Sequence, residues 1–248
     1  DQWPYHAVAD VMLANSLLRS FPEIDSKRIG LTGISWGGYL TCVAAGVDHR
    51  FQFAVPVYGC GFLNESPAFQ SAREANPEGA RRWFELWDAS HFVPRIACPT
   101  LWVNGANDPF FPLNIYGKSF ALCGGARNLS IQVGLAHSHV HGWQPKEIDA
   151  FADSFAKHGA PLARVIGQGV EASSAWAAFE ARIPPQHAEL VWTDDVQDWV
   201  GCAWRAESAP IDAAGDKVRV ALPDGCRAYF FRLIDDRSLV ITSAVTAP

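Results

Sequence analysis

A serine between two glycines is the first residue whose surroundings suggest chemistry. Residues 33–37 read GISWG, a G-x-S-x-G pattern centred on Ser35. At a turn between a strand and a helix, this pattern lifts the serine hydroxyl clear of the backbone, where it can attack an acyl carbon once a base removes its proton. A pattern this short also arises by chance. It indicates a nucleophile only if a strand precedes it and a helix follows it.

The segments on either side of Ser35 fit such a turn. Residues 29–32 (IGLT) are a short apolar run typical of a buried strand, and residues 39–45 (YLTCVAA) have the small side chains of a helix packed tightly on a sheet. This order predicts that Ser35 lies at the carboxyl edge of the sheet. Side chains at three nearby glycines are expected to collide with the neighbouring strand and helix: Gly33, Gly37 and Gly38.

Asp108 is the predicted acid. It lies in a turn directly after the apolar run 100–104 (TLWVN), where a carboxylate can orient an imidazole ring. An acid after the serine in chain order, followed by a histidine, is the order expected for this kind of turn. The structural alternative is an Asx turn, which aspartate before Pro109 favours.

The base is expected from the histidine-rich segment 136–141 (AHSHVH), which follows the apolar run 130–133. His137 is the first candidate because it is closest to the end of that strand, and His139 is the second. Three histidines at alternating positions could instead bind a metal ion. No paired carboxylate or cysteine motif accompanies them, so we predict neither a metal nor a cofactor site.

The order of apolar segments predicts the elements that position these residues. Strands alternate with helices, which favours an α/β layer architecture with a parallel sheet. Between residues 61 and 94 polar residues mix with aromatic ones, and this stretch is expected to form an inserted cap over one end of the sheet. The predicted helices are 5–20 and 145–158. The further predicted strands are 53–58, 100–104 and 130–133.

Composition changes near residue 159, so we divide the chain into three parts. Residues 1–165 are predicted to form the catalytic unit, residues 166–187 a linker with a short helix around 175–181, and residues 188–248 a small β-sandwich. Alternating polar and apolar residues between turn signals predict the sandwich strands 188–193, 199–206, 217–222, 227–233 and 238–243.

Composition also excludes several classes of protein. The 248 residues are 49% hydrophobic and carry a formal charge of −6, with no basic run that would form a nucleic-acid footprint. No apolar stretch approaches the roughly 20 residues of a membrane helix, so no membrane span is expected. The six cysteines include no C-x-x-C pair and are expected to be mostly free thiols. A bond between Cys202 and Cys226 remains open.

Together the segment 29–38, Pro99 before its strand, the turn at 105–108 and the late histidine resemble the catalytic domain of α/β-hydrolases. The prolyl-oligopeptidase-like and acetylxylan-esterase-like branch is the most similar, and the resemblance covers about residues 1–158. It implies that Ser35 is the nucleophile, that His137 or His139 is the base and that Asp108 orients it. It also implies that the backbone N–H of Trp36 is one oxyanion donor.

In complete members of this family several strands precede the serine turn, whereas here only one helix does. The chain is therefore expected to be the C-terminal part of a longer polypeptide. Its missing N-terminal part, or a companion chain, is expected to be a partner.

The expected function is a serine hydrolase that cleaves a carboxylic ester through an acyl-enzyme, acting on carbohydrate or short-chain acyl esters. A peptidase of the prolyl-oligopeptidase type is the first alternative. A binding or structural module containing an inactive hydrolase part is the alternative from another class.

Overall fold

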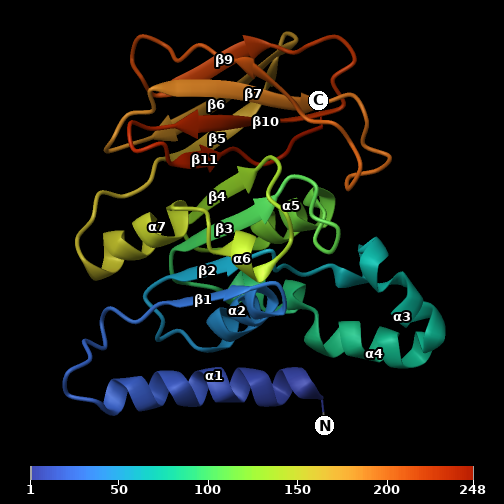
Figure 1. Ribbon diagram of the computed structural model, residues 1–248, viewed down its shortest axis with the longest axis vertical. Helices are drawn as coiled ribbons and strands as arrows, with labels where there is room; N and C mark the ends of the chain where they lie inside the picture. Colours follow the sequence, from blue (N-terminus) through green and yellow to red (C-terminus); the bar gives the residue numbers. More distant parts are fainter. Residues whose placement is uncertain (1, 248) are drawn as a thin grey trace.

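A four-stranded parallel sheet forms the centre of the first half of the chain. The computed structural model describes residues 2–247 and gives the strand order β1-β2-β3-β4 (Figure 1). Every residue of β2 and β3 is buried, which accounts for their continuous apolar sequences. The strands are β1 (Leu31–Ile34), β2 (Ala54–Val57), β3 (Thr100–Gly105) and β4 (Arg127–Gln132).

Helices connect and cover these strands, which fits the α/β-hydrolase fold that the sequence resembles. The helix α2, which follows β1, packs on β1 and β2, and α1 packs in turn on α2. The predicted strand at 29–32 begins two residues later, because Ile29 and Gly30 belong to the loop that leads into β1. The helices are α1 (Trp3–Ser20), α2 (Trp36–Val47), α5 (Leu113–Leu122), α6 (His139–Gly142) and α7 (Glu147–Ala156).

Residues 61–94, the segment predicted as a cap, lie between β2 and β3 and contain no strand. They form short helical segments, of which α3 and α4 project beside the sheet in Figure 1. The buried Asp88 carboxylate fixes the base of this cap by accepting hydrogen bonds from the backbone N–H groups of Phe62, Leu63 and Ser90. The segments are η1 (Leu63–Glu65), η2 (Pro67–Phe69), α3 (Gln70–Ala75), α4 (Pro77–Trp87), η3 (Ala89–His91) and η4 (Val93–Arg95).

Residues 164–247, which we call the β unit, form two packed antiparallel sheets of order β5-β6-β9 and β11-β10-β7-β8. Strands β7 and β10 of the second sheet are largely buried on both faces, whereas β8 at its edge is exposed. Along β10, Phe230 packs into the hydrolase core, while Tyr229 and Phe231 pack against the first sheet. The strands are β5 (Arg164–Glu171), β6 (Ser174–Glu180), β7 (His187–Thr193), β8 (Arg205–Ser208), β9 (Lys217–Ala221), β10 (Ala228–Ile234) and β11 (Val240–Thr242).

The predicted linker and short helix over residues 166–187 are wrong, because β5 and β6 pair as a hairpin there. The predicted linker includes two glycines of β5, and the Trp176 ring of β6 lies over both Gly167 and Gly169 and fills the space that they leave. The alanine-rich stretch 175–181 suggested a helix. Alternate residues of that stretch, Ala175, Ala177 and Phe179, are buried, which is the period of a strand.

The predicted strand 199–206 is also mostly wrong. Residues 194–204 form a loop, and only the last residues of the predicted span belong to β8. Trp199 and Trp204 pack against the hydrolase core from this loop, so their apolar character reflects burial outside a strand.

All six cysteines are free thiols, and Cys202 and Cys226 are not bonded.

The β unit joins the parallel sheet at a seam between β4 and β11. The Ser130 hydroxyl donates to the Val240 carbonyl at 2.8 Å, and the Thr242 hydroxyl donates to the Leu129 carbonyl at 3.3 Å. The Val240 N–H donates to the buried Glu147 carboxylate of α7 at 2.6 Å. Side chains therefore supply the hydrogen bonds of this seam.

Among residues 2–247, no helix has both the length and the apolar character that a membrane span requires.

Candidate active site

Ser35 lies between β1 and α2 with an unusual backbone conformation. Its φ is 60° and its ψ is −118°, a region that non-glycine residues seldom occupy and that costs about 1–3 kcal/mol. Its N–H donates to the Val57 carbonyl of the neighbouring strand at 2.9 Å, which helps to hold the turn. The strained turn presents the hydroxyl at the carboxyl edge of the sheet, as the sequence pattern predicts.

Two of the three nearby glycines are required by close packing. A Cβ at Gly33 would lie 2.3 Å from the Gly37 carbonyl oxygen, and one at Gly38 would lie 2.4 Å from the Val57 oxygen. A Cβ at Gly37 would have no neighbour within 4 Å. The predicted collision is therefore wrong at Gly37, because its α carbon faces open space.

The Asp108 carboxylate is fully buried and uses its two oxygens differently. Oδ1 accepts from the N–H groups of Phe110 and Phe111 at 2.9 and 2.8 Å, while Oδ2 lies 2.7 Å from Nδ1 of His137. The first oxygen thus makes the Asx-type turn that was the structural alternative. The second remains available to orient the imidazole.

His137 connects the other two residues. Its Nε2 lies 2.9 Å from Oγ of Ser35, so the structure brings Ser35, His137 and Asp108 into one chain of hydrogen bonds. Three aromatic rings surround the imidazole, with centroids 4.6 Å away for Tyr58, 4.7 Å for Phe110 and 5.9 Å for Phe111. The ring is therefore confined on several sides.

Tyr58 also fixes the backbone next to His137. Its hydroxyl donates to the Ala136 carbonyl at 2.9 Å. Burial, with a smaller contribution from the nearby Asp108 charge, raises the pKa of Tyr58, so the hydroxyl remains a donor at neutral pH. Sequence reasoning missed Tyr58, although its position directly after the buried strand β2 placed it at the same sheet edge as Ser35.

The other two histidines of the segment do not join this chain. His139 is exposed, and His141 pairs through Nδ1 with the Ser138 hydroxyl at 2.7 Å. No group of three or more potential metal ligands occurs among residues 2–247. Of the two histidines named from the sequence, the geometry therefore favours His137 over His139.

Trp36 begins α2 immediately after Ser35, and its N–H is one of the free donors at the helix N-terminus. Its indole is 40% exposed and packs against other rings, at centroid distances of 5.3 Å to Trp3, 5.5 Å to Phe69 and 6.3 Å to Trp83. The side chain is thus a wall of an aromatic cavity, a role that the serine pattern gave no reason to expect.

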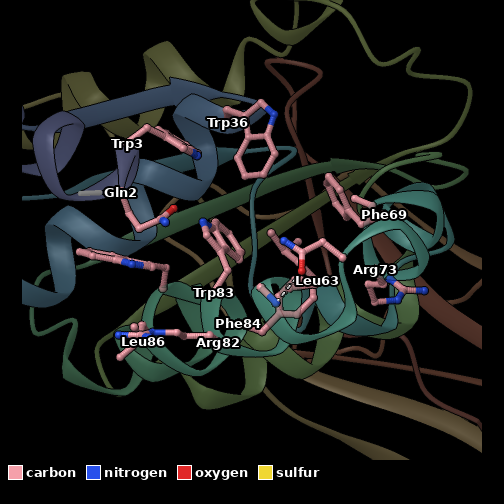
Figure 2. Close-up of a pocket in the computed structure, with 15 residues that line it drawn as sticks. Gln2, Trp3, Trp36, Leu63, Phe69, Arg73, Arg82, Trp83, Phe84 and Leu86 are labelled. Carbon is pink, nitrogen blue, oxygen red and sulfur yellow. Dashed lines mark hydrogen bonds between the residues drawn. The ribbon is translucent and has the colours of Figure 1, made fainter.

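The cavity has a volume of about 470 Å³ and lies between α2 and the cap (Figure 2). None of the three hydrogen-bonded residues lines it, yet it adjoins them. Trp36 follows Ser35 in the chain, and Phe69 packs at 6.5 Å on Phe111, the ring that stacks on His137. Its other apolar walls are Trp3, Leu63, Ala72, Ala80, Trp83, Phe84, Leu86 and Trp87.

Two solved structures show the same fold. The chain is similar to the acetyl xylan esterase from Paenibacillus sp. R4, with 21% identity and a TM-score of 0.53 over 60% of this chain and 52% of that one. It is also similar to a puromycin-hydrolyzing peptidase of Mycobacterium tuberculosis, with 23% identity and a TM-score of 0.53 over 62% of this chain and 26% of that one. The chain thus spans about half of the esterase and about a quarter of the peptidase.

The sequence match agrees with the fold. Residues 1–144 match the model of the prolyl oligopeptidase family, which includes β1 to β4, the serine turn, the cap, Asp108 and His137. This match covers more than half of the 248 residues. The chain therefore belongs to the prolyl oligopeptidase family, within the α/β-hydrolases.

Proposed function

We propose that the protein is a serine hydrolase in which Ser35 is the nucleophile, His137 the general base and Asp108 the residue that orients it. The observation that carries this proposal is the chain of two hydrogen bonds, 2.9 Å from Ser35 Oγ to His137 Nε2 and 2.7 Å from His137 Nδ1 to Asp108 Oδ2. Membership of the prolyl oligopeptidase family supports it.

The geometry supports a defined course for the reaction. His137 takes the Ser35 proton at Nε2 while Asp108 holds Nδ1 protonated, and the serine oxygen adds to the acyl carbon. The Trp36 N–H donates to the oxygen on which negative charge develops. His137 then returns the proton to the leaving group, and water repeats the sequence to release the acid.

A carboxylic ester is the proposed substrate bond. The apolar cavity beside Trp36 could hold an acyl or alcohol group, and one structure of the same fold is an acetyl xylan esterase. An amide bond is the second candidate, because the matching family is that of prolyl oligopeptidase. Comparing kcat/KM for p-nitrophenyl acetate with that for aminoacyl p-nitroanilides in the full-length protein tests this choice.

Replacing the serine tests the nucleophile. Ser35→Ala should lower kcat by at least about 1000-fold, because loss of a triad member ordinarily costs several orders of magnitude. The control is Ser154→Ala, which removes a hydroxyl on α7 whose one hydrogen bond among residues 2–247 goes to the Phe151 carbonyl. Activity of Ser35→Ala within about tenfold of wild type would rule out the assignment.

The histidines provide a separate test. His137→Ala should be as damaging as the serine change, whereas His139→Ala and His141→Ala should retain most activity. An inactive His139→Ala together with an active His137→Ala would assign the base to His139. A protein that turns over no ester or amide at all would favour the binding or structural module.

A further inference from the structure

The cavity beside Ser35 is shaped for a flat group. Trp36 and Trp83 meet edge to face with centroids 6.3 Å apart, and Trp83 stacks at 5.9 Å on Tyr39. Aromatic walls favour a planar apolar guest, because rings gain from offset and edge-to-face contacts beyond the area that they bury. At about 470 Å³ the cavity is within the range of small-molecule sites.

The charges that line the cavity are all positive. Among the described residues its lining includes Arg73 and Arg82 but no aspartate or glutamate, although the whole chain carries a net charge of −6. The Arg73 guanidinium donates to the Ser66 carbonyl at 2.8 Å and is thereby tied to the base of the cap. This leaves Arg82 as the cation available to a guest.

Two adjacent arginines of α4 differ in a way that supports this role. Arg81 forms an exposed ion pair with Glu85 at 2.6 Å. Arg82 makes no hydrogen bond or ion pair with any side chain in the part of the chain that the structure describes. In Figure 2, Arg82 and Trp36 lie at opposite ends of the cavity, with Trp83 between them.

We propose that this cavity binds a flat, aromatic part of the substrate that carries a carboxylate, and that Arg82 pairs with that carboxylate. The proposal rests on the proposed function, since the group would belong to the ester cleaved at Ser35. The aromatic walls would hold the ring, while the guanidinium at the far end would select the anion over a neutral group of the same shape. Arg82 would then determine specificity without taking part in bond cleavage.

Binding can be measured without any turnover. Isothermal titration of the full-length protein should give about fivefold tighter binding for naphthoate than for the neutral naphthylmethanol, as expected for a charge-assisted pair at a partly exposed site. Arg82→Gln should abolish this preference and leave the affinity for naphthylmethanol unchanged. Arg81→Gln, the matched control, should behave as wild type. Added salt should weaken the preference for naphthoate.

Two further variants test the site and the chemistry of the pair. Trp83→Ala should weaken both ligands, and Arg82→Lys should restore part of the preference. Equal binding of both ligands to wild type would overturn the proposal, as would a Trp83→Ala protein that binds both normally. If the protein hydrolyses esters but does not bind naphthoate more tightly than naphthylmethanol, only this inference is contradicted. If it prefers naphthoate but hydrolyses no ester, only the proposed function is contradicted.

Kinetics then identify which half of the ester occupies the cavity. Monomethyl terephthalate carries its carboxylate on the acyl side, and acetoxybenzoate carries it on the alcohol side. The Arg82→Gln change should lower kcat/KM about fivefold for one of them, while the neutral counterparts dimethyl terephthalate and phenyl acetate should be unaffected. Unchanged kcat/KM for both anionic esters would overturn the proposal.

Discussion

The hydrolase sheet is flanked by α1 on one side and the β unit on the other (Figure 1). The two are held in place by different kinds of interaction. A charged clamp holds α1. The buried Asp48 carboxylate accepts from Arg50 at 2.6 Å and from Asn15 of α1 at 3.0 Å, and Arg50 also donates to the Met12 carbonyl. The β unit is held by a seam of two hydroxyls and the buried Glu147 carboxylate, and by a hydrophobic core that continues into the hydrolase.

The two attachments also differ in their relation to the proposed triad. Asp48 is the C-cap of α2 and Ser35 its N-cap, so the clamp lies about 20 Å along the helix from the serine. The β unit reaches the acid turn directly, because Asn107, the neighbour of Asp108, donates through Nδ2 to the Cys202 carbonyl at 2.9 Å. The clamp therefore contributes mainly to stability, whereas the β unit also supports the site.

The largest effect is expected from Phe230→Ala. This side chain is fully buried, belongs to the hydrolase core although it lies on β10, and meets Trp204 at 5.3 Å. Its loss should reduce the free energy of unfolding by about 3–5 kcal/mol. Chemical denaturation should show one transition for both parts. Two separate transitions, or a loss as small as that of the half-exposed Val170→Ala, would show that the β unit is an independent domain.

Asp48→Asn tests the clamp. The hydrogen bonds from Arg50 hold the pKa of Asp48 at about 2, so the ionised carboxylate stabilises the folded state by about 2 kcal/mol. Because the folded pKa is below its ordinary value, this stabilisation is present above about pH 4 and is lost as the pH falls toward 2. Denaturation across that range should show the loss in wild type and not in the variant.

The control for the clamp is Asp25→Asn, which breaks an exposed pair with Arg28 and should change stability by less than about 1 kcal/mol. Activity per folded molecule should be unchanged in Asp48→Asn. A fall in kcat would mean that the clamp also supports the proposed triad.

Asn107→Asp tests the support that the β unit gives to the site. The substitution keeps the shape but places a carboxylate oxygen against the Cys202 carbonyl, which should loosen the turn that holds Asp108. We expect kcat to fall about tenfold, equivalent to about 1.4 kcal/mol, with KM little changed. The control is Asn128→Asp, since Asn128 makes the same kind of bond to the Ala163 carbonyl, away from Asp108.

Equal kcat values for these two asparagine variants would show that the Cys202 contact is purely structural. Thermal unfolding of both variants should also be recorded. We expect both to lose stability and only Asn107→Asp to show a lower kcat.

The smallest effect is expected from Glu147→Gln. Burial raises the pKa of Glu147, despite the hydrogen bond from the Val240 N–H, and the nearby Asp235 raises it further. A raised folded pKa means that stability is greatest at low pH and falls as the pH rises through that pKa, the reverse of Asp48. The glutamine variant should lose this slope, whereas Glu180→Gln, which removes an exposed charge, should keep it.

These contrasts also explain what the sequence could and could not predict. The turn at Ser35 depends on adjacent residues, and the order of Ser35, Asp108 and His137 follows from the fold, so both are predictable. The choice of His137 over His139 depended only on distance from a strand end. Burial of alternate residues decides whether 175–181 is a strand, and an alanine-rich sequence does not reveal which face is covered.

Contacts between distant parts of the chain were beyond sequence reasoning. The bond from Asn107 joins residues 95 positions apart, and nothing in the local sequence of either loop indicates the partner. The aromatic residues of the cap likewise show that a cluster exists but not which rings face a cavity. Phe62 belongs to that sequence cluster, yet its ring lies 5.6 Å from the Lys118 ammonium and lines no part of the cavity.

The seam between β4 and β11 has a consequence for hydrogen exchange. β11 pairs with β10 through a backbone ladder, whereas toward β4 the Ile131 N–H donates to the Thr242 hydroxyl at 3.3 Å. An amide that is protected by a side chain across the seam becomes exposed whenever the β unit separates from the hydrolase, even if both remain folded. The Ile131 amide should therefore report the free energy of that separation, while amides shared by β2 and β3 report global unfolding.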